Sequence, residues 1–296
     1  MEFLNKIDKQ QVQKITLIVI AALTILALVL LLVIVIASVN PASPFGISDG
    51  ISNQVDYTVT EKDLLTGSLV LADKDHAYNV SADLLNLVEG CQAYRNQQLD
   101  AAGIDHTNKD NLPYIPYKGM QLSLPAMESA HKMLSDAIAD VKQKPIVIDG
   151  TYGTIYHGGA DVEEFKTGLL MYLSDYASEV NKHVAMSGEY KNWFNNNASK
   201  YGFIESFEYG YRYVGKVHAK VISGDKNIKS LADYIAYLKE NTNVGKTIEV
   251  ELDGATYKVY YIPCKAGETI KVPADTANTT LSGTNEGGII VTVKVK

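Results

Sequence analysis

The hydrophobic pattern divides the chain into one long apolar run near the N-terminus and a larger remainder of short elements. The run, Ile15–Val39, has no charged side chain over about 25 residues. As a helix, that length crosses a hydrocarbon core of ~30 Å, and it exceeds the ~7–15 apolar residues of a typical signal peptide. The pattern therefore predicts a retained transmembrane helix over residues 15–39, with a cleaved signal peptide as the alternative.

Lysines flank this run on one side only. Lys6, Lys9 and Lys14 precede it, and the next basic residue is Lys62. Because basic residues flanking a membrane span favour the cytoplasmic side, residues 1–14 are predicted to form a cytoplasmic tail. We therefore expect a single-pass protein of the cell membrane whose C-terminal bulk is extracytoplasmic.

Periodicity in the remainder predicts a mixture of helices and strands. Pro, Ser, Gly and Asn dominate residues 40–53, so residues 40–57 are expected to form a linker. Helical spacing and end signals predict helices over Ser81–Leu99, Pro125–Val141, Ser187–Tyr201 and Ile228–Asn241. Short apolar or alternating runs predict strands at Gly67–Leu71, Pro145–Ile148, Gly168–Leu173 and Tyr209–Val214. Residues 58–242 are therefore expected to form an α+β domain.

The C-terminal segment has a different pattern. Two alternating runs surround Asp253-Gly254, a strong hairpin signal, and further strand-like runs follow at TIKVP and GGIIVTVKV. Residues 243–296 are therefore predicted to form a small β-rich domain or an extension of the main domain.

Composition narrows the function classes. The chain has 27 basic and 34 acidic residues, a net charge of −7, and no basic stripe, so nucleic acid is not an expected partner. No GxSxG or P-loop motif is present. Cys91 and Cys264 are far apart in sequence; a disulfide is allowed outside the cell, and two small buried side chains are the alternative.

Two segments carry a resemblance to a known family. Residues 167–173 read TGLLMYL, and residues 193–215 read WFNNNASKYGFIESFEYGYRYVG. Together they resemble the VanY-type D-alanyl-D-alanine carboxypeptidases, a bacterial family of zinc DD-peptidases, over roughly residues 59–240. The resemblance implies an α+β zinc D-Ala-D-Ala carboxypeptidase-like domain with a small antiparallel sheet. It also implies that Trp193, Tyr201 and Phe203 are core residues.

The residues that perform the chemistry in that family are replaced here. The resemblance places the zinc-binding histidine, aspartate and second histidine at Phe165, Tyr172 and Gly210, and the general base at Phe207. A catalytic zinc site needs three protein ligands and a nearby proton acceptor. Phenylalanine and glycine have no side-chain lone pair, and tyrosine is a poor ligand at its usual pKa of ~10. We therefore expect a degenerate member with no catalytic residue and no zinc or other cofactor.

The former cleft is the candidate binding site. A weaker third match places Tyr152 where the family has an arginine for the substrate carboxylate. If the TGLLMYL and RYVG segments are neighbouring strands, as the resemblance implies, Phe165, Tyr172 and Gly210 lie close together. The candidate cleft residues are Tyr152, Phe165, Tyr172, Phe207, Glu208, Tyr209 and Gly210.

These observations predict a membrane-anchored, extracytoplasmic and catalytically inactive carboxypeptidase-like protein. Its expected partner, besides the membrane, is a peptidoglycan stem peptide or a cell-envelope protein. One alternative is an active DD-carboxypeptidase with displaced ligands, and another is a structural protein whose cleft is filled. Residues that offer displaced ligands are His157, His183, His218, Glu163, Glu164 and Glu208. The resemblance implies that His218 is structural, because the family has a non-ligand histidine there.

Overall fold

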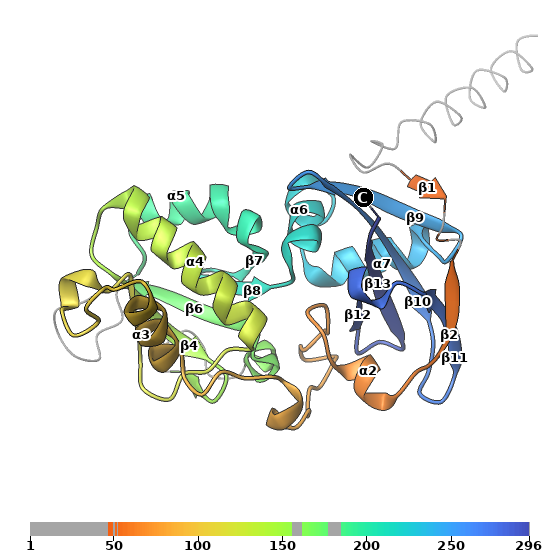
Figure 1. Ribbon diagram of the computed structural model, residues 1–296, viewed down its shortest axis with the longest axis horizontal. Helices are drawn as coiled ribbons and strands as arrows, with labels where there is room; N and C mark the ends of the chain where they lie inside the picture. Colours follow the sequence, from red (N-terminus) through yellow and green to blue (C-terminus); the bar gives the residue numbers. More distant parts are fainter. Residues whose placement is uncertain (1–46, 50, 52, 156–161, 177–184, 296) are drawn as a thin grey trace, which may run out of the picture. The chain divides into compact units, whose positions relative to one another are not determined.

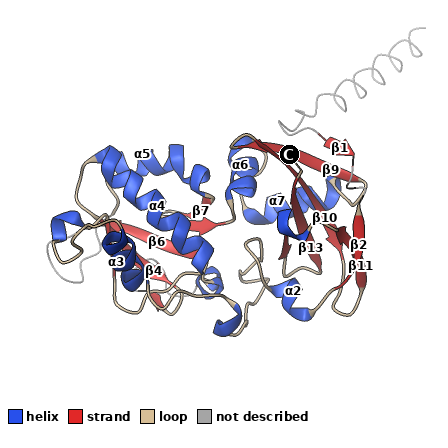
Figure 2. Ribbon diagram, viewed as in Figure 1, coloured by secondary structure: helices blue, strands red, loops and turns tan. Residues whose placement is uncertain are grey.

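A mixed six-stranded sheet organises the first half of the described chain (Figures 1 and 2). The computed structural model describes residues 47–49, 51, 53–155, 162–176 and 185–295. The strands are β3 (Tyr114–Pro116), β4 (Ile146–Thr151), β5 (Thr154–Ile155), β6 (Leu170–Asp175), β7 (Phe203–Phe207) and β8 (Gly210–Tyr213). Their order is β3-β4-β6-β8-β7, with β5 paired to β4.

The sheet is not purely antiparallel, which corrects the expectation from the sequence. β3 pairs with β4 in parallel, and the other pairs are antiparallel. A parallel pair needs a crossover connection, and the amphipathic helix α4 (Leu124–Val141) provides it.

Helices cover one face of this sheet, as Figure 1 shows for α4 and α5. Alternate strand residues such as Met171, Leu173 and Tyr211 pack with buried side chains of these helices in one core. The helices are α3 (Cys91–Ala101), α4 and α5 (Gly188–Asn197), and α5 continues into a 3₁₀ turn at Ala198–Tyr201. Residues that alternate with these core positions, such as Leu170 and Tyr172, face the other side and form the site described below.

A second, antiparallel sheet forms from both ends of the described chain. Its order is β1 (Ile47–Asp49), β9 (Lys246–Leu252), β10 (Ala255–Pro263), β13 (Gly288–Lys294) and β12 (Thr279–Gly283). β2 (Gln54–Thr58) pairs with β11 (Thr269–Pro273), and α2 (Glu61–Leu65) contacts β12. The remaining 3₁₀ turns are Ala82–Leu84, Lys109–Asn111, Glu163–Thr167 and Thr276–Asn278.

Helices α6 (Lys216–Gly224) and α7 (Leu231–Asn241) join the two sheets. Ile204 of β7 and Val214 share one apolar core with these helices and with β9, β10 and β13. Residues 45–296 accordingly form one compact unit, within which the β-rich segment is packed.

Several sequence predictions are confirmed. Helices α4, α5 and α7 lie within the predicted ranges or one residue outside them, and strands occupy 146–151, 170–175 and 210–213. The hairpin turn lies at Asp253-Gly254, where both residues have the positive φ that a tight two-residue turn requires. Strands also form at TIKVP and within GGIIVTVKV.

Three predictions about the first part of the chain are wrong. Residues 40–57 are not simply a linker, because β1 and β2 lie there and pair with β9 and β11. Gly67–Leu71 is apolar and buried from residue 69 onward but not a strand; the Leu69 N–H donates to Ser282 Oγ and the Leu71 N–H to the Thr284 carbonyl. Ser81–Leu99 is not one helix, since Leu87 forms a β-bridge with Ser123 between the 3₁₀ turn and α3.

The predicted cytoplasmic tail and transmembrane helix, residues 1–39, lie outside the described residues. Among the residues that are described, no helix combines the length and the apolar character needed for a membrane span. Cys91 and Cys264 are both buried and unbonded, which matches the interpretation as two small core side chains.

Candidate functional site

Strands β6 and β8 bring the two resemblance segments together. Tyr172 of β6 is the register partner of Gly210 of β8. Phe165 lies in the 3₁₀ turn that precedes β6, and Phe207 ends β7 and pairs with Gly210. The prediction that Phe165, Tyr172 and Gly210 lie close together is therefore confirmed.

Aromatic rings fill the space at these positions. Phe165 and Tyr172 are buried in a group with Leu170, against which Val162, Phe207 and Tyr209 pack; we call these six residues the aromatic cluster. The Phe207 ring stacks on that of Tyr172 at a centroid distance of 6.1 Å, and its edge contact with Phe165 spans 6.3 Å. The cluster is therefore a packed apolar group on the face of the sheet opposite α4.

Two glycines allow these rings to approach the backbone. A Cβ atom on Gly210 would lie 2.5 Å from Phe207 Cζ, closer than real Cβ contacts. A Cβ on Gly150 would lie 3.2 Å from both Phe165 Cζ and Tyr172 Cβ. The Phe207 ring thus occupies the volume that any side chain at position 210 would need.

The donor set at these positions does not fit zinc. Phe165, Phe207 and Gly210 have no side-chain atom that can coordinate a metal. Burial, and secondarily the charge of Asp149, raises the pKa of the Tyr172 phenol, so this group stays protonated at neutral pH. No cluster of three or more His, Cys, Asp or Glu suited to a metal ion occurs among the described residues.

The carboxylates near the cluster bind partners other than one another. Glu208 Oε1 accepts from Lys191 Nζ at 3.0 Å, which lowers the pKa of that exposed carboxyl. Glu164 Oε2 accepts from Ser206 Oγ at 2.5 Å. Glu163 Oε1 accepts from Lys166 Nζ at 2.6 Å. Each carboxylate therefore has its own local partner, and Glu208 is not a member of the aromatic cluster.

Comparison with known proteins identifies one similar sequence and one similar solved structure. No protein-family model matches the chain. A D-alanyl-D-alanine carboxypeptidase of Enterococcus faecium is 27% identical over 272 residues, which cover 86% of this chain and 84% of that protein. The chain is a relative of the D-alanyl-D-alanine carboxypeptidases.

A solved structure supports the same conclusion about the fold. The crystal structure of the vancomycin-resistance D,D-dipeptidase VanXYg, in complex with a D-Ala-D-Ala phosphinate analogue, has a TM-score of 0.61 to this chain. The match has 17% sequence identity and covers 82% of this chain and all of that one. At this identity the likeness shows that the two proteins share a fold.

Of the remaining candidate residues in this carboxypeptidase relative, Tyr152 lies away from its predicted position and His218 has the structural role that was expected. Tyr152 is outside the aromatic cluster: it is half-buried against a separate apolar group that includes Val70 and Tyr78, and it forms a β-bridge with Gln121, so the weak third match does not place it with the other candidates. His218 is buried and bonded to Tyr234 Oη and Thr292 Oγ1, as expected for a structural histidine. His157 and His183 lie outside the described residues.

The carboxypeptidase-like fold keeps an open cleft beside the cluster. Its volume is about 320 Å³. Its lining consists of Leu71, Ala72, Asp73, Lys74, Val162, Glu163, Glu164, Ser206, Phe207, Ser230, Leu231 and Ala232. The sequence did not indicate this cleft, because nothing in the local pattern links Asp73 and Lys74 to residues 230–232.

Proposed function

We propose that this chain is a membrane-anchored, extracytoplasmic relative of the D-alanyl-D-alanine carboxypeptidases that binds a cell-wall stem peptide without cleaving it. The observation that carries the proposal is the Phe207 ring, which fills the space above Gly210. It removes the place for one metal ligand and puts a hydrocarbon ring where the resemblance implies the general base. Without a bound metal or a proton acceptor, the site has no means of activating water.

The cleft beside the aromatic cluster supports the binding half of this proposal. Three acidic residues, Asp73, Glu163 and Glu164, and one basic residue, Lys74, give its lining a net negative charge. Phe207 and Leu231 supply apolar surface. A stem peptide offers both kinds of group, with an amine on its diamino acid and methyl groups on its alanines. Acidic side chains favour the amine, and the apolar wall favours the methyl groups.

Metal content and turnover test the loss of catalysis. We expect detergent-solubilised full-length protein to contain far less than one equivalent of zinc and to release no D-alanine from a soluble pentapeptide. The Enterococcus faecium carboxypeptidase, assayed in parallel, is the comparison enzyme. One equivalent of zinc together with chelator-sensitive D-alanine release would establish the alternative, an active peptidase with displaced ligands.

Calorimetric titration of the same protein with the pentapeptide tests the binding half. We expect saturable binding that weakens in Glu163→Gln and stays unchanged in the matched surface variant Glu240→Gln. Absence of binding in the wild type would leave a cell-envelope protein, or a purely structural role, as the function of this fold.

Membrane anchorage is tested by protease access. The proposal places residues 1–14 in the cytoplasm and the described unit outside, because lysines precede the apolar run and none follows it before Lys62. Protease added to intact protoplasts should therefore remove the C-terminal mass. Protection of that mass would overturn the orientation.

A further inference from the structure

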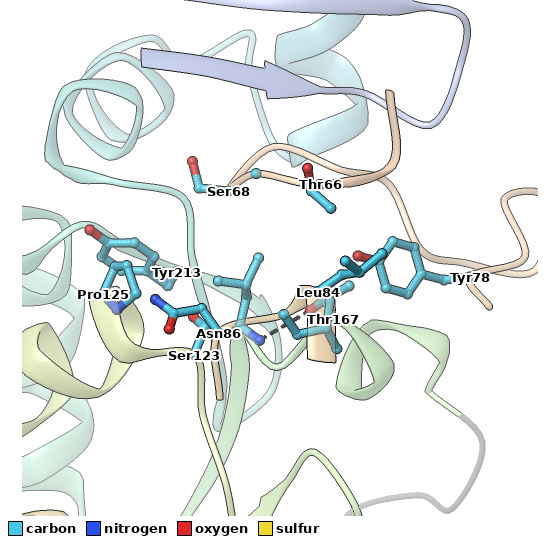
Figure 3. A pocket seen from close by; sticks show the side chains of 12 residues that line it. Thr66, Ser68, Tyr78, Leu84, Asn86, Ser123, Pro125, Thr167 and Tyr213 are labelled. Carbon is cyan, nitrogen blue, oxygen red and sulfur yellow. Dashed lines mark hydrogen bonds between the residues drawn. The ribbon is translucent and has the colours of Figure 1, made fainter. Parts of the chain in front are cut away.

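A second pocket lies at the N-terminus of helix α4, away from the aromatic cluster (Figure 3). Its volume is about 200 Å³. Its lining consists of Thr66, Gly67, Ser68, Tyr78, Leu84, Leu85, Asn86, Ser123, Pro125, Thr167, Leu169 and Tyr213. It shares no lining residue with the cleft beside the aromatic cluster. We call it the α4 pocket.

Ser123 places an unused hydroxyl in the α4 pocket. It is the N-cap residue of α4, but its side chain makes no capping hydrogen bond. Its Oγ is buried and has no hydrogen-bond partner, and the whole residue is 5% exposed. A buried hydroxyl without a partner is destabilising, so a ligand that accepts its hydrogen bond would remove this cost.

The helix terminus adds a positive field at the same place. The first N–H groups of a helix have no acceptor within the helix. Here the Ser123 N–H donates to the Gly168 carbonyl and the Leu124 N–H to the Asn86 carbonyl, while Pro125 has no N–H. The next N–H group, that of Ala126, receives no side-chain cap from Ser123. The partial positive charge at this 18-residue helix's start therefore lies beside the pocket.

A buried cation lies directly behind the pocket wall. Arg212 is fully buried, and its guanidinium donates to Thr167 Oγ1 at 2.6 Å and to the carbonyls of Ser68 and Tyr213 at 3.2 and 3.3 Å. All three of these partners line the α4 pocket. Among the described residues no carboxylate forms an ion pair with Arg212; its other hydrogen bond goes to the Val70 carbonyl. Burial lowers the pKa of the Arg212 guanidinium and the charge of Glu164 raises it, so the cation has a counter-charge beyond hydrogen-bonding contact that an anion in this pocket would supplement.

The residues that line the α4 pocket would not repel an anion. It contains no acidic side chain, although the chain as a whole has a net charge of −7. Leu84, Leu169 and Tyr213 provide apolar surface around the polar end. In Figure 3, Thr66 and Ser68 border the pocket on one side, and Asn86, Ser123 and Thr167 border it on the other.

We infer that the α4 pocket binds the carboxylate of a small aliphatic acid or of a peptide terminus. The Ser123 hydroxyl donates to the carboxylate, and the positive end of α4 and the Arg212 guanidinium attract it from behind the pocket wall. The apolar residues contact the short body that carries it. The volume equals roughly seven waters at ~30 Å³ each, which admits a short acid or a terminal residue and excludes a folded chain.

Calorimetric titration of the full-length protein with carboxylate and amide pairs tests this inference. The probes are isobutyrate and isobutyramide, and the tetrapeptide acetyl-Gly-Gly-Ala-Ala with a free or an amidated C-terminus. We expect saturable binding of the acids and at least tenfold weaker binding of the amides, because the amides lack the charge. Tighter binding of isobutyrate would identify a free small acid as the natural ligand, and tighter binding of the peptide would identify a chain terminus.

Two variants and one control separate binding from folding. Ser123→Ala should weaken acid binding about tenfold without lowering Tm, because its hydroxyl caps nothing in the free protein. Leu84→Trp, at a position that is 37% exposed, should abolish binding by filling the pocket. Ser223→Ala, on the exposed side of α6, should bind like the wild type. Equal binding of acids and amides, no saturable binding, or equal affinity in Ser123→Ala and Ser223→Ala would overturn the inference. The pentapeptide also carries a terminal carboxylate, so the variants assign its binding: Ser123→Ala changes only the α4 pocket and Glu163→Gln only the cleft beside the aromatic cluster, because the two sites share no lining residue.

Discussion

At the residue scale, Gly210 and Phe207 have to be considered together. The missing Cβ of Gly210 leaves the volume that the Phe207 ring occupies, and the ring also stacks on Tyr172. Overpacking a well-filled site typically costs about 1–3 kcal/mol. The same substitution without the obstructing ring should be close to neutral, because alanine is favoured over glycine in a strand by about 0.5–1 kcal/mol.

We therefore expect Gly210→Ala to destabilise the wild type by about 1–3 kcal/mol and to cost less than about 0.5 kcal/mol in a Phe207→Ala background. Urea unfolding of the wild type, both single variants and the double variant gives the coupling. A Gly210→Ala cost that is the same in both backgrounds would mean that the ring is not the obstacle.

Sequence alone located four of the site residues but not their packing. The resemblance segments gave the positions of Phe165, Tyr172, Phe207 and Gly210, because strand pairing brings those positions together. The weaker third match suggested Tyr152 as well, but the structure places this residue outside the aromatic cluster. The sequence also did not indicate Ser123, because a serine before Leu-Pro resembles an ordinary N-cap residue. Only the structure shows that its hydroxyl makes no capping hydrogen bond.

At the element scale, helix α5 differs from expectation in how deeply it is buried. Trp193 and Tyr201 were expected to be core residues with Phe203, yet both are only partly buried, while Phe203 is fully buried. The Trp193 indole N–H donates to Asp140 on α4 at 2.8 Å, and the Tyr201 hydroxyl donates to Asp136 at 2.6 Å. These rings therefore lie at the α4–α5 boundary, with their polar ends near solvent.

We expect Phe203→Ala to cost about 3–5 kcal/mol and Trp193→Ala about 1–3 kcal/mol, since only the first substitution empties a fully buried site. Chemical denaturation of the two variants measures both values. A larger loss for Trp193→Ala than for Phe203→Ala would show that the helix packs more deeply than described.

Element prediction succeeded where periodicity and end signals agreed, as in α4 and in the β9–β10 hairpin. It failed at residues 67–71, where the apolar pattern is real but the backbone bonds to Ser282 and Thr284 instead of to a strand. Such distant polar partners leave no trace in local periodicity. The strands β1 and β2 were missed for a related reason: turn-forming composition obscured segments that only their pairing with β9 and β11 defines.

At the scale of the whole molecule, His218 connects parts that are distant in sequence. From α6, its ring bonds to Tyr234 Oη of α7 at 2.9 Å and to Thr292 Oγ1 of β13 at 3.0 Å. Complete burial lowers the pKa of His218 from 6.5 to about 3. In the unfolded chain the ring takes up a proton near pH 6.5, so between pH 6.5 and 3 the unfolded state binds more protons than the folded state.

Stability from the neutral His218 ring is therefore fully present above pH 6.5 and declines as the pH falls toward 3. The slope contributed by this residue is about 1.4 kcal/mol per pH unit within that window. We expect His218→Gln, which keeps a polar side chain but does not titrate, to have a shallower decline in unfolding free energy between pH 7 and 4. Parallel declines in the two proteins would assign the acid sensitivity to other groups.

The Phe207 ring above Gly210 also has a consequence for reversibility in evolution. A path of single substitutions from this chain to a zinc-binding one has two possible orders. It either adds a side chain at position 210 while the Phe207 ring is still present, or removes the ring before a metal ligand has been introduced. The first order passes through an overpacked intermediate and the second through a cavity, and neither intermediate binds metal. Phe165, in contact with Gly150 and Phe207, adds a second barrier of the same kind. Packing alone thus makes the exchange of metal ligands for aromatic rings difficult to reverse by single substitutions.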